Sequence, residues 1–257
     1  HGRHGLPWRQ TRDPYRILVS EVMLQQTQVS RVLRKYPEFL EAFPTMRALD
    51  RAPLDRVLRI WQGMGYNRRA VYLKRLAKII AADYGGRIPA DPTALHRLPG
   101  IGLGTAGAIT AFAFNEAVTF LETNIRRVYI HFFFGDRRRI RDAEILKKIQ
   151  ATLPQRNTRE WYYALMDYGA LALKGVENPN RRSASYARQP KFSGSRRELR
   201  GKILAAVIQR DEAVSERLSR RITGRRAHER FRAALNGLLA EGLLARSRGR
   251  ITAPRQP

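Results

Sequence analysis

The sequence predicts an all-α fold for most of the chain. Apolar residues recur at helical spacing in one segment after another, and alternating strand patterns are scarce before the C-terminal residues. Proline and glycine separate these segments at short intervals. The 257 residues suffice for one large domain or two small ones with a buried core. We therefore expect a helical main body followed by a smaller C-terminal domain.

The first predicted helix covers residues 14–36. Asp13 supplies an N-cap, and Pro14 suits the first helical position. Apolar residues such as Ile17 and Val29 then recur near the helical spacing. Similar patterns predict further helices over residues 45–50, 53–61, 68–84, 92–98, 104–114, 124–133, 141–152 and 158–172.

The composition changes over residues 175–195, which are rich in Asn, Pro, Ser and Arg and read as a linker or a DNA-facing arm. Beyond this stretch we expect three helices and a short hairpin that turns at Arg248-Gly249, an order typical of a winged helix. The helices are predicted over residues 199–209, 214–222 and 227–239, and the hairpin over 243–251. The predicted domains are a main body (1–175), a basic linker or arm (176–195) and a winged-helix domain (196–257).

The formal net charge is +27, from 49 Lys and Arg residues against 22 Asp and Glu residues. A charge of this size needs a polyanionic partner to offset its self-repulsion. Nucleic acid fits better than a membrane surface, because no long basic amphipathic helix with an aromatic face is apparent. No run approaches the roughly 18 apolar residues of a membrane span, and the first residues lack the apolar core of a signal peptide. We expect a cytoplasmic, nucleoid-associated protein that acts as a monomer without membrane contact.

Cysteine is absent from the sequence. This excludes disulfides, thiolate metal sites and cysteine nucleophiles.

Residues 95–110 have the spacing of a helix-hairpin-helix. Leu98 ends one helix on its apolar face, Gly100 and Gly102 form a tight turn, and Ala106 packs the second helix back. Backbone amides at such a helix start bind a phosphate oxygen without reading a base. Glycine is needed because a Cβ would block both the turn and the phosphate. An ordinary αα-hairpin is the simpler alternative, but the full spacing favours a DNA-binding hairpin.

This pattern resembles the hairpin of the helix-hairpin-helix (HhH-GPD) DNA glycosylase superfamily, which includes endonuclease III and the adenine DNA glycosylases. Residues 20–28 look like the helix that carries the catalytic glutamate of adenine glycosylases. Further matches flank it at residues 7–9, 61–66 and 166–170, and the likeness covers residues 6–173. The resemblance implies a two-lobed helical glycosylase domain that acts in base-excision repair on double-stranded DNA bearing a mismatch or lesion.

Two glutamates are the predicted catalytic residues. Breaking an N-glycosidic bond passes through an oxocarbenium-like sugar, and two carboxyl groups in different environments are a general solution. Glu21 lies among apolar neighbours where burial raises its pKa, and the resemblance implies that it protonates adenine and helps to activate water. Glu122 occupies a position that is normally aspartate, so its reach changes by about a bond length. The simpler alternatives are a surface glutamate at Glu21 and a helix N-terminal glutamate, favoured by the dipole, at Glu122.

The resemblance also implies residues that bind DNA or the substrate. Gln26 and Tyr66 match positions that contact or wedge into the duplex around the lesion, although packing or a solvated helix face would also explain them. Asn67 replaces a second tyrosine common in adenine glycosylases. Asn124 and Arg126 are expected to hydrogen-bond the site or a phosphate. The predicted set is Gln26, Tyr66, Asn67, Leu98, Gly100, Ile101, Gly102, Gly104, Thr105, Asn124, Arg126, Arg181 and Arg182.

Two further departures from the family refine the expectation. Bifunctional members carry a lysine at the position of Gly104 to form a Schiff base, so glycine implies a monofunctional enzyme that uses water. The four cysteines that usually hold an iron-sulphur cluster are missing, so we expect no cluster, no other cofactor and no metal. The pairs Arg181-Arg182 and Arg196-Arg197 are hypothesised to take over phosphate contacts from the cluster loop.

We therefore expect an enzyme that hydrolyses the N-glycosidic bond of a mispaired or damaged base, with adenine opposite 8-oxoguanine or guanine favoured. The C-terminal segment does not look like the 8-oxoguanine-reading domain of adenine glycosylases. This leaves open a thymine or uracil mismatch glycosylase, or one for another damaged base. A non-catalytic lesion-recognition protein is the alternative outside the enzymes. Asp167 is expected to cap or brace a helix rather than to catalyse.

Overall fold

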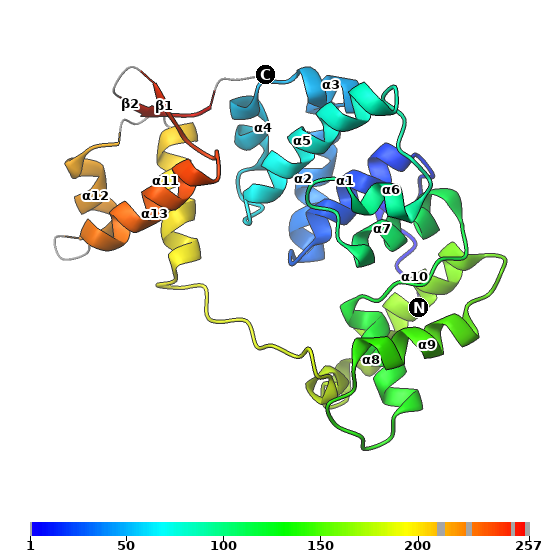
Figure 1. The fold of residues 1–257 in the computed structure, drawn as a ribbon. Helices are drawn as coiled ribbons and strands as arrows, with labels where there is room; N and C mark the ends of the chain where they lie inside the picture. The colour runs from blue at the N-terminus through cyan, green and yellow to red at the C-terminus, as the bar shows by residue number, and fades with distance from the viewer. Residues whose placement is uncertain (1, 210–213, 225–227, 248–249, 255–257) are drawn as a thin grey trace. The chain divides into compact units, whose positions relative to one another are not determined.

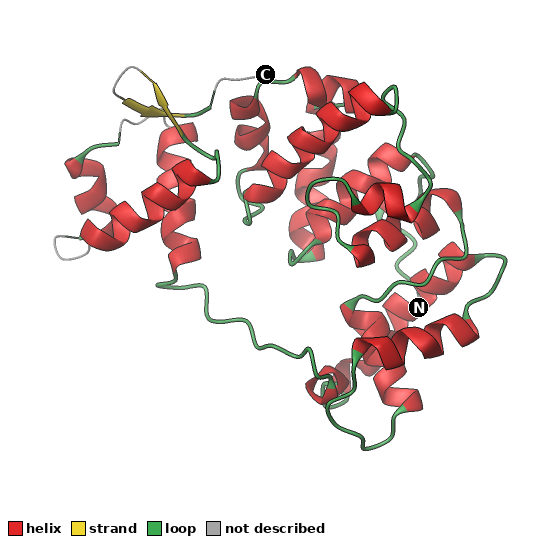
Figure 2. Ribbon diagram, in the orientation of Figure 1, coloured by secondary structure: helices red, strands yellow, loops and turns green. Residues whose placement is uncertain are grey.

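The computed structural model describes residues 2–209, 214–224, 228–247 and 250–254. The expected all-α fold is confirmed, since the described residues are helices and loops apart from one small hairpin (Figures 1 and 2). The α-helices are α1 (Pro14–Leu24), α2 (Val29–Ala42), α3 (Met46–Arg51), α4 (Leu54–Trp61), α5 (Arg68–Asp83), α6 (Pro92–His96), α7 (Leu103–Ile109), α8 (Thr123–Phe133), α9 (Asp142–Thr152), α10 (Thr158–Leu171), α11 (Arg196–Gln209), α12 (Glu216–Thr223) and α13 (His228–Ala240). In the described part of the chain, no helix is both long and apolar enough to cross a membrane.

The chain divides into two compact units, and each unit combines segments that are distant in sequence. The first unit comprises residues 1–21 and 88–189, and the second comprises residues 22–87 and 190–257. The domain boundaries predicted from composition, at residues 175 and 196, stay a prediction.

The core of the first unit lies between α8, α10 and the chain after α7. Phe112 stacks on Tyr163 with ring centroids 4.5 Å apart, and the ring of Phe120 lies 4.1 Å from that of Tyr162. Helix α10 approaches α8 so closely that a Cβ on Gly169 would lie 2.4 Å from the carbonyl oxygen of Asn124. A side chain at Gly169 would therefore displace the start of α8.

The core of the second unit packs α5 against α3 and α4, and α11 against α4 and α13. The Phe39 ring makes edge-to-face contacts with Phe43 and Trp61, and all three side chains are buried. Glu241, just after α13, pairs with Arg68 of α5 at 2.8 Å and with Arg200 of α11 at 2.5 Å. These ion pairs tie the C-terminal helices to α5 within the unit.

The C-terminal segment has the element order expected of a winged helix. Helices α11, α12 and α13 precede β1 (Ala245–Ser247) and β2 (Arg250–Thr252), which pair antiparallel with Arg246 opposite Ile251. The turn predicted at Arg248-Gly249 lies outside the described residues.

Two of the predicted helices differ from the structure. Residues 104–114, expected as one helix, form α7 followed by a π-helical turn at Thr110–Phe114. The single helix predicted over residues 14–36 is wrong: α1 ends at Leu24, and α2 begins at Val29 and continues past Pro37. Between them Gln26 adopts a left-handed backbone with a φ of +52°. Burial of Phe39 offsets the helical hydrogen bond that Pro37 removes.

The buried side chain of Arg69, on α5, explains the break between α1 and α2. Its guanidinium donates to carbonyl groups at the end of α1 and in the loop before α5, and these groups would otherwise lack helical partners. Burial lowers the pKa of Arg69 to about 10, which leaves it charged. The acceptors are the carbonyl oxygens of Val22 (2.9 Å), Met23 (2.8 Å), Gln25 (2.7 Å), Met64 (3.3 Å), Gly65 (3.0 Å) and Tyr66 (3.4 Å), and the hydroxyl of Thr27 (2.9 Å).

We predict that Arg69→Met lowers the free energy of unfolding by about 3 kcal/mol or more, because it leaves several buried carbonyl groups without a donor. Arg69→Lys, which keeps the charge but has fewer donors, should fall between Arg69→Met and the wild type. Arg75→Met, at an exposed position of the same helix, is the matched control. Urea denaturation of the full chain measures the three, and equal values for Arg69→Met and Arg75→Met would contradict the role given to Arg69.

Candidate active site

The predicted hairpin at residues 95–110 is present in the first unit. Asp91 caps α6 by accepting from the amides of Thr93 and Ala94 at 3.0 and 3.1 Å. Gly100 has a φ of +79°, a conformation that favours glycine. Leu98 and Ile101 flank it as buried anchors, and the Ile101 amide donates to the Leu98 carbonyl at 3.2 Å. The turn is therefore tight and rigidly packed.

Helix α7 begins at the hairpin, with Gly102 as its N-cap. Among the described residues no side chain caps this end, so the positive end of the helix offers backbone amides alone. Gly104 lies in the first turn, where an added Cβ would be 3.1 Å from the carbonyl oxygen of Leu121. Because Leu121 directly precedes Glu122, the hairpin lies beside the loop that leads to the second predicted carboxylate.

Glu21, near the C-terminal end of α1, is half-buried among apolar neighbours. The pKa of its carboxyl group is raised from 4.5 to about 8, mainly by burial and then by the charge of Glu122, while the charge of Arg9 opposes the shift. Glu21 is therefore protonated at neutral pH. The charge of Glu122 thus acts on Glu21, and both carboxyl groups belong to the first unit.

Glu122 is the N-cap of α8. Its Oε1 accepts from the amides of Asn124 at 2.7 Å and Ile125 at 2.8 Å, and its Oε2 accepts from the Asn124 side chain at 3.3 Å. Burial raises the pKa of Glu122, while these hydrogen bonds and the charge of Arg126 oppose the increase. The simpler alternative, a glutamate at a helix start, therefore also holds, since the carboxylate caps α8.

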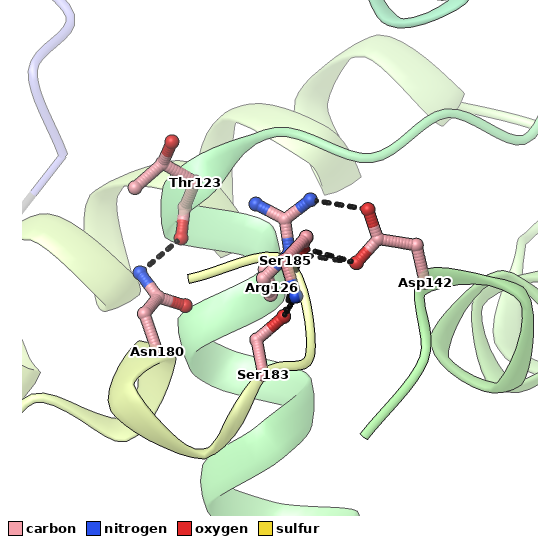
Figure 3. A network of polar contacts seen from close by, with 6 residues as sticks. All are labelled: Thr123, Arg126, Asp142, Asn180, Ser183 and Ser185. Carbon is pink, nitrogen blue, oxygen red and sulfur yellow. Dashed lines mark hydrogen bonds and ion pairs between the residues drawn. The ribbon is translucent and has the colours of Figure 1, made fainter. Parts of the chain in front are cut away.

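Asn124 and Arg126 were expected to hydrogen-bond the site or a phosphate, and they have different partners. Asn124 donates to Glu122 as described above. Arg126 donates through Nε and Nη2 to Asp142 at 3.1 and 2.8 Å, and Ser185 joins the same carboxylate at 3.0 Å (Figure 3). In the same view, Asn180 donates to the carbonyl of Thr123. The network fixes the first turn of α8 to α9 and to the segment after α10.

An ion pair that the sequence did not predict holds the N-terminal segment next to Glu21. Arg9 donates to both oxygens of Asp167 at 2.7 and 2.9 Å, and Asp167 also accepts from the Arg3 amide at 2.8 Å. Arg9 lies over the ring of Tyr163, 4.3 Å from its centroid. Asp167 is thus a brace, as expected, and it offsets the Arg9 charge that acts on Glu21.

Three of the predicted DNA-contacting residues belong to the second unit. Gln26 and Tyr66 are exposed, both have left-handed backbones, and Arg69 donates to the carbonyl groups beside them. Asn67 directly precedes α5 and makes no side-chain cap in the described structure. The Tyr66 hydroxyl accepts from Nη1 of Arg197 at 2.9 Å. Sequence reasoning had no signal for that contact.

The paired arginines of the predicted arm have different surroundings. Arg182 is half-buried and donates to the Ile130 carbonyl at 3.1 Å, which fastens the arm to α8. Arg181 is exposed and pairs with Glu177 at 3.3 Å. Arg196, of the second pair, donates to the Ala233 carbonyl. Their contact with DNA phosphate, and that of Thr105 in the first turn of α7, stay predictions.

The residues present do not fit an iron-sulphur cluster. The chain has no cysteine to supply thiolate ligands, and α10 is followed by the short helical turn Ala172–Gly175. Among the described residues, no group of three or more His, Asp or Glu side chains could hold a metal ion.

Comparison with known proteins places this geometry in a family. Residues 19–155 match the model described as "HhH-GPD superfamily base excision DNA repair protein". An adenine DNA glycosylase of Mycolicibacterium smegmatis is 34% identical over 261 residues, which cover 95% of this chain and 89% of the relative. One of Buchnera aphidicola subsp. Baizongia pistaciae is 39% identical over 171 residues, 66% of this chain and 49% of the relative. The chain thus spans about half the length of the Buchnera relative.

A solved structure has the same fold. The structure of a thermostable thymine-DNA glycosylase aligns with a TM-score of 0.59 and 29% sequence identity, over 65% of this chain and 78% of that chain. The family model, the full-length relative and the fold agree. The chain therefore belongs to the HhH-GPD superfamily of base excision DNA repair proteins.

Proposed function

We propose that the protein is a monofunctional DNA glycosylase that hydrolyses the N-glycosidic bond of adenine mispaired with 8-oxoguanine or guanine. The observation that carries the proposal is the pair Glu21 and Glu122. Two carboxyl groups interact within one unit, one of them protonated at neutral pH and the other held by amide donors that favour its ionised form. This is the division of roles that glycosidic bond cleavage requires.

The protonated Glu21 donates its proton to a ring nitrogen of the purine, so the base leaves with the electron pair of the glycosidic bond. Ionised Glu122 stabilises the positive charge that develops at C1′ of the sugar. Glu21, now ionised, accepts a proton from the water whose oxygen bonds to C1′. The products are the free base and an abasic site, and Glu21 ends the cycle protonated.

DNA binding supplies the remaining part of the proposal. The start of α7, at Gly102 and Gly104, is suited to a backbone phosphate, and the net charge of +27 favours association with the duplex. The protein then acts as a monomer on mismatched DNA inside the cell, with Gln26 and Tyr66 filling the space left by the flipped nucleotide.

A second candidate is a thymine or uracil mismatch glycosylase. The 29% identity to a thymine-DNA glycosylase supports it, as does Asn67, where adenine glycosylases commonly have tyrosine. A buried, protonated acid such as Glu21 favours a purine, because purines leave more readily once protonated. A lesion-binding protein without catalysis would need neither carboxylate.

The first test is an excision assay on duplexes bearing A·8-oxoG, A·G, T·G, U·G, hypoxanthine and alkylated bases, with alkali cleavage of abasic sites. We expect the fastest product from A·8-oxoG. Glu21→Gln and Glu122→Gln should each lower the single-turnover rate by about 10²- to 10⁴-fold, whereas Glu160→Gln, at an exposed position of α10, should not. Tight lesion binding without product from any duplex would rule out an enzyme.

The raised pKa of Glu21 also predicts the pH dependence of stability. The folded state retains a proton that the unfolded chain releases above pH 4.5, so wild-type stability falls as pH rises from 4.5 to about 8, by ~1.4 kcal/mol per pH unit for this group. Glu21→Gln cannot ionise and should become increasingly more stable than the wild type over that window, while being inactive. Urea denaturation at pH 5, 6.5 and 8 measures this. Curves that stay parallel, as expected for Glu160→Gln, would refute the buried acid.

Gly104 predicts that no covalent intermediate forms. Because glycine has no amine at the position of the lysine in bifunctional enzymes, borohydride reduction during excision should trap no protein-DNA adduct. Gel electrophoresis of labelled duplex, with a bifunctional glycosylase as positive control, detects such an adduct. A trapped species at a rate matching excision would mean that another amine attacks the sugar.

A further inference from the structure

The C-terminal segment contacts Tyr66, one of the residues proposed to enter the duplex. Arg197, in the first turn of α11, donates through Nη1 to the Tyr66 hydroxyl at 2.9 Å and through Nη2 to the Pro190 carbonyl at 2.7 Å. Both residues lie in the second unit although 131 positions separate them. The guanidinium is thereby oriented by two acceptors on the protein surface.

The elements that carry Arg197 and Tyr66 are fixed to one another. Glu241 accepts from Arg68, two residues after Tyr66, and from Arg200, three residues after Arg197. Two arginines that share one carboxylate fix the position of α5 relative to α11 more firmly than a single exposed ion pair would. The ion pairs of Glu241 therefore support the hydrogen bond between Arg197 and Tyr66.

An exposed aromatic ring adjoins Arg197. Phe192 is 60% exposed, and the Arg197 guanidinium lies 6.0 Å from the centroid of its ring. The loop that carries Phe192 is anchored at Gly194, whose amide donates to Glu198 at 2.6 Å and whose carbonyl accepts from Arg230 at 2.9 Å. The anchored loop therefore presents the Phe192 ring and the Arg197 guanidinium together at the surface.

The chemistry of this surface fits an unpaired base. Aromatic rings and guanidinium planes stack on bases, and arginine in addition donates hydrogen bonds to base edges. Tyr66, Arg197 and Phe192 offer a ring, a guanidinium and a second ring within one unit. A protein partner would also accept aromatic residues, but the strong positive charge favours a nucleic acid.

We propose that Arg197 and Phe192 extend the Tyr66 wedge and contact the base that remains unpaired opposite the excised nucleotide. The C-terminal segment thereby determines which opposing base the enzyme accepts. This inference rests on the proposed function, because the position of Tyr66 in the duplex comes from it.

The test measures binding of the full chain to duplexes with a tetrahydrofuran abasic-site analogue opposite 8-oxoguanine, guanine, cytosine or thymine, by fluorescence anisotropy. The wild type should prefer particular opposing bases. Arg197→Ala and Phe192→Ala should each reduce that preference about tenfold, as loss of a base contact does. Arg197→Lys, which keeps the charge but lacks the planar group, should resemble Arg197→Ala.

The matched control is Arg232→Ala, which removes an exposed arginine from α13. It should weaken binding to all duplexes equally, as loss of a phosphate contact or of net charge does. Combining Tyr66→Phe with Arg197→Ala should be non-additive, since each breaks the same hydrogen bond. Circular dichroism melting confirms that the variants fold.

The outcomes separate this inference from the proposed function. Uniform weakening by Arg197→Ala, as in the control, would overturn the inference, as would a wild type without opposing-base preference. An opposing-base preference that depends on Arg197, in a protein that excises no base, would sustain the inference and refute the proposed activity.

Discussion

The first unit contains two half-buried carboxyl groups, Glu21 and Glu122, and the charge of Glu122 acts on Glu21. Burial raises the pKa of both groups, and the charge of Glu122 also raises the pKa of Glu21, so ionising both together is unfavourable. The amides at the start of α8 point to Glu122 and settle which group ionises first. Arg9, which acts on Glu21, and Arg126, which acts on Glu122, each have a carboxylate partner of their own, and this limits how strongly they lower the two pKa values.

Much of the positive charge holds the protein together rather than facing a partner. Arg69 in the second unit, and Arg127, Arg159 and Arg182 in the first, all donate to backbone carbonyl oxygens of distant segments. Arginine suits this task because its planar group serves several acceptors and stays charged when partly buried. The composition therefore indicates a polyanionic partner. The net charge nevertheless counts arginines that bind the protein's own backbone and are not available to DNA.

The features that the sequence predicted are those that depend on residues close together in the chain. The glycine spacing defined the hairpin, and proline, glycine and apolar periodicity located most helices within a few residues. The break at Gln26 was missed because its cause, Arg69, lies more than 40 residues away and donates to carbonyl groups that any sequence would supply. The contact between Arg197 and Tyr66 was missed for the same reason. Both carboxylates were predicted from a family resemblance, since residues 101 positions apart leave no local pattern.

The extra methylene at Glu122 can be interpreted through its hydrogen bonds. Oε1 accepts both amides of the α8 start at 2.7 and 2.8 Å, whereas Oε2 accepts only the longer 3.3 Å bond from the Asn124 side chain. Aspartate is the better N-cap in general, but its shorter side chain would draw the charge back toward the helix. With glutamate, Oε1 accepts both amide hydrogen bonds at the start of α8. Oε2, which accepts only the longer bond, is better able to turn toward a sugar cation. A departure from the family pattern is thus compatible with the proposed chemistry, because one residue caps the helix and stabilises the developing charge with different oxygens.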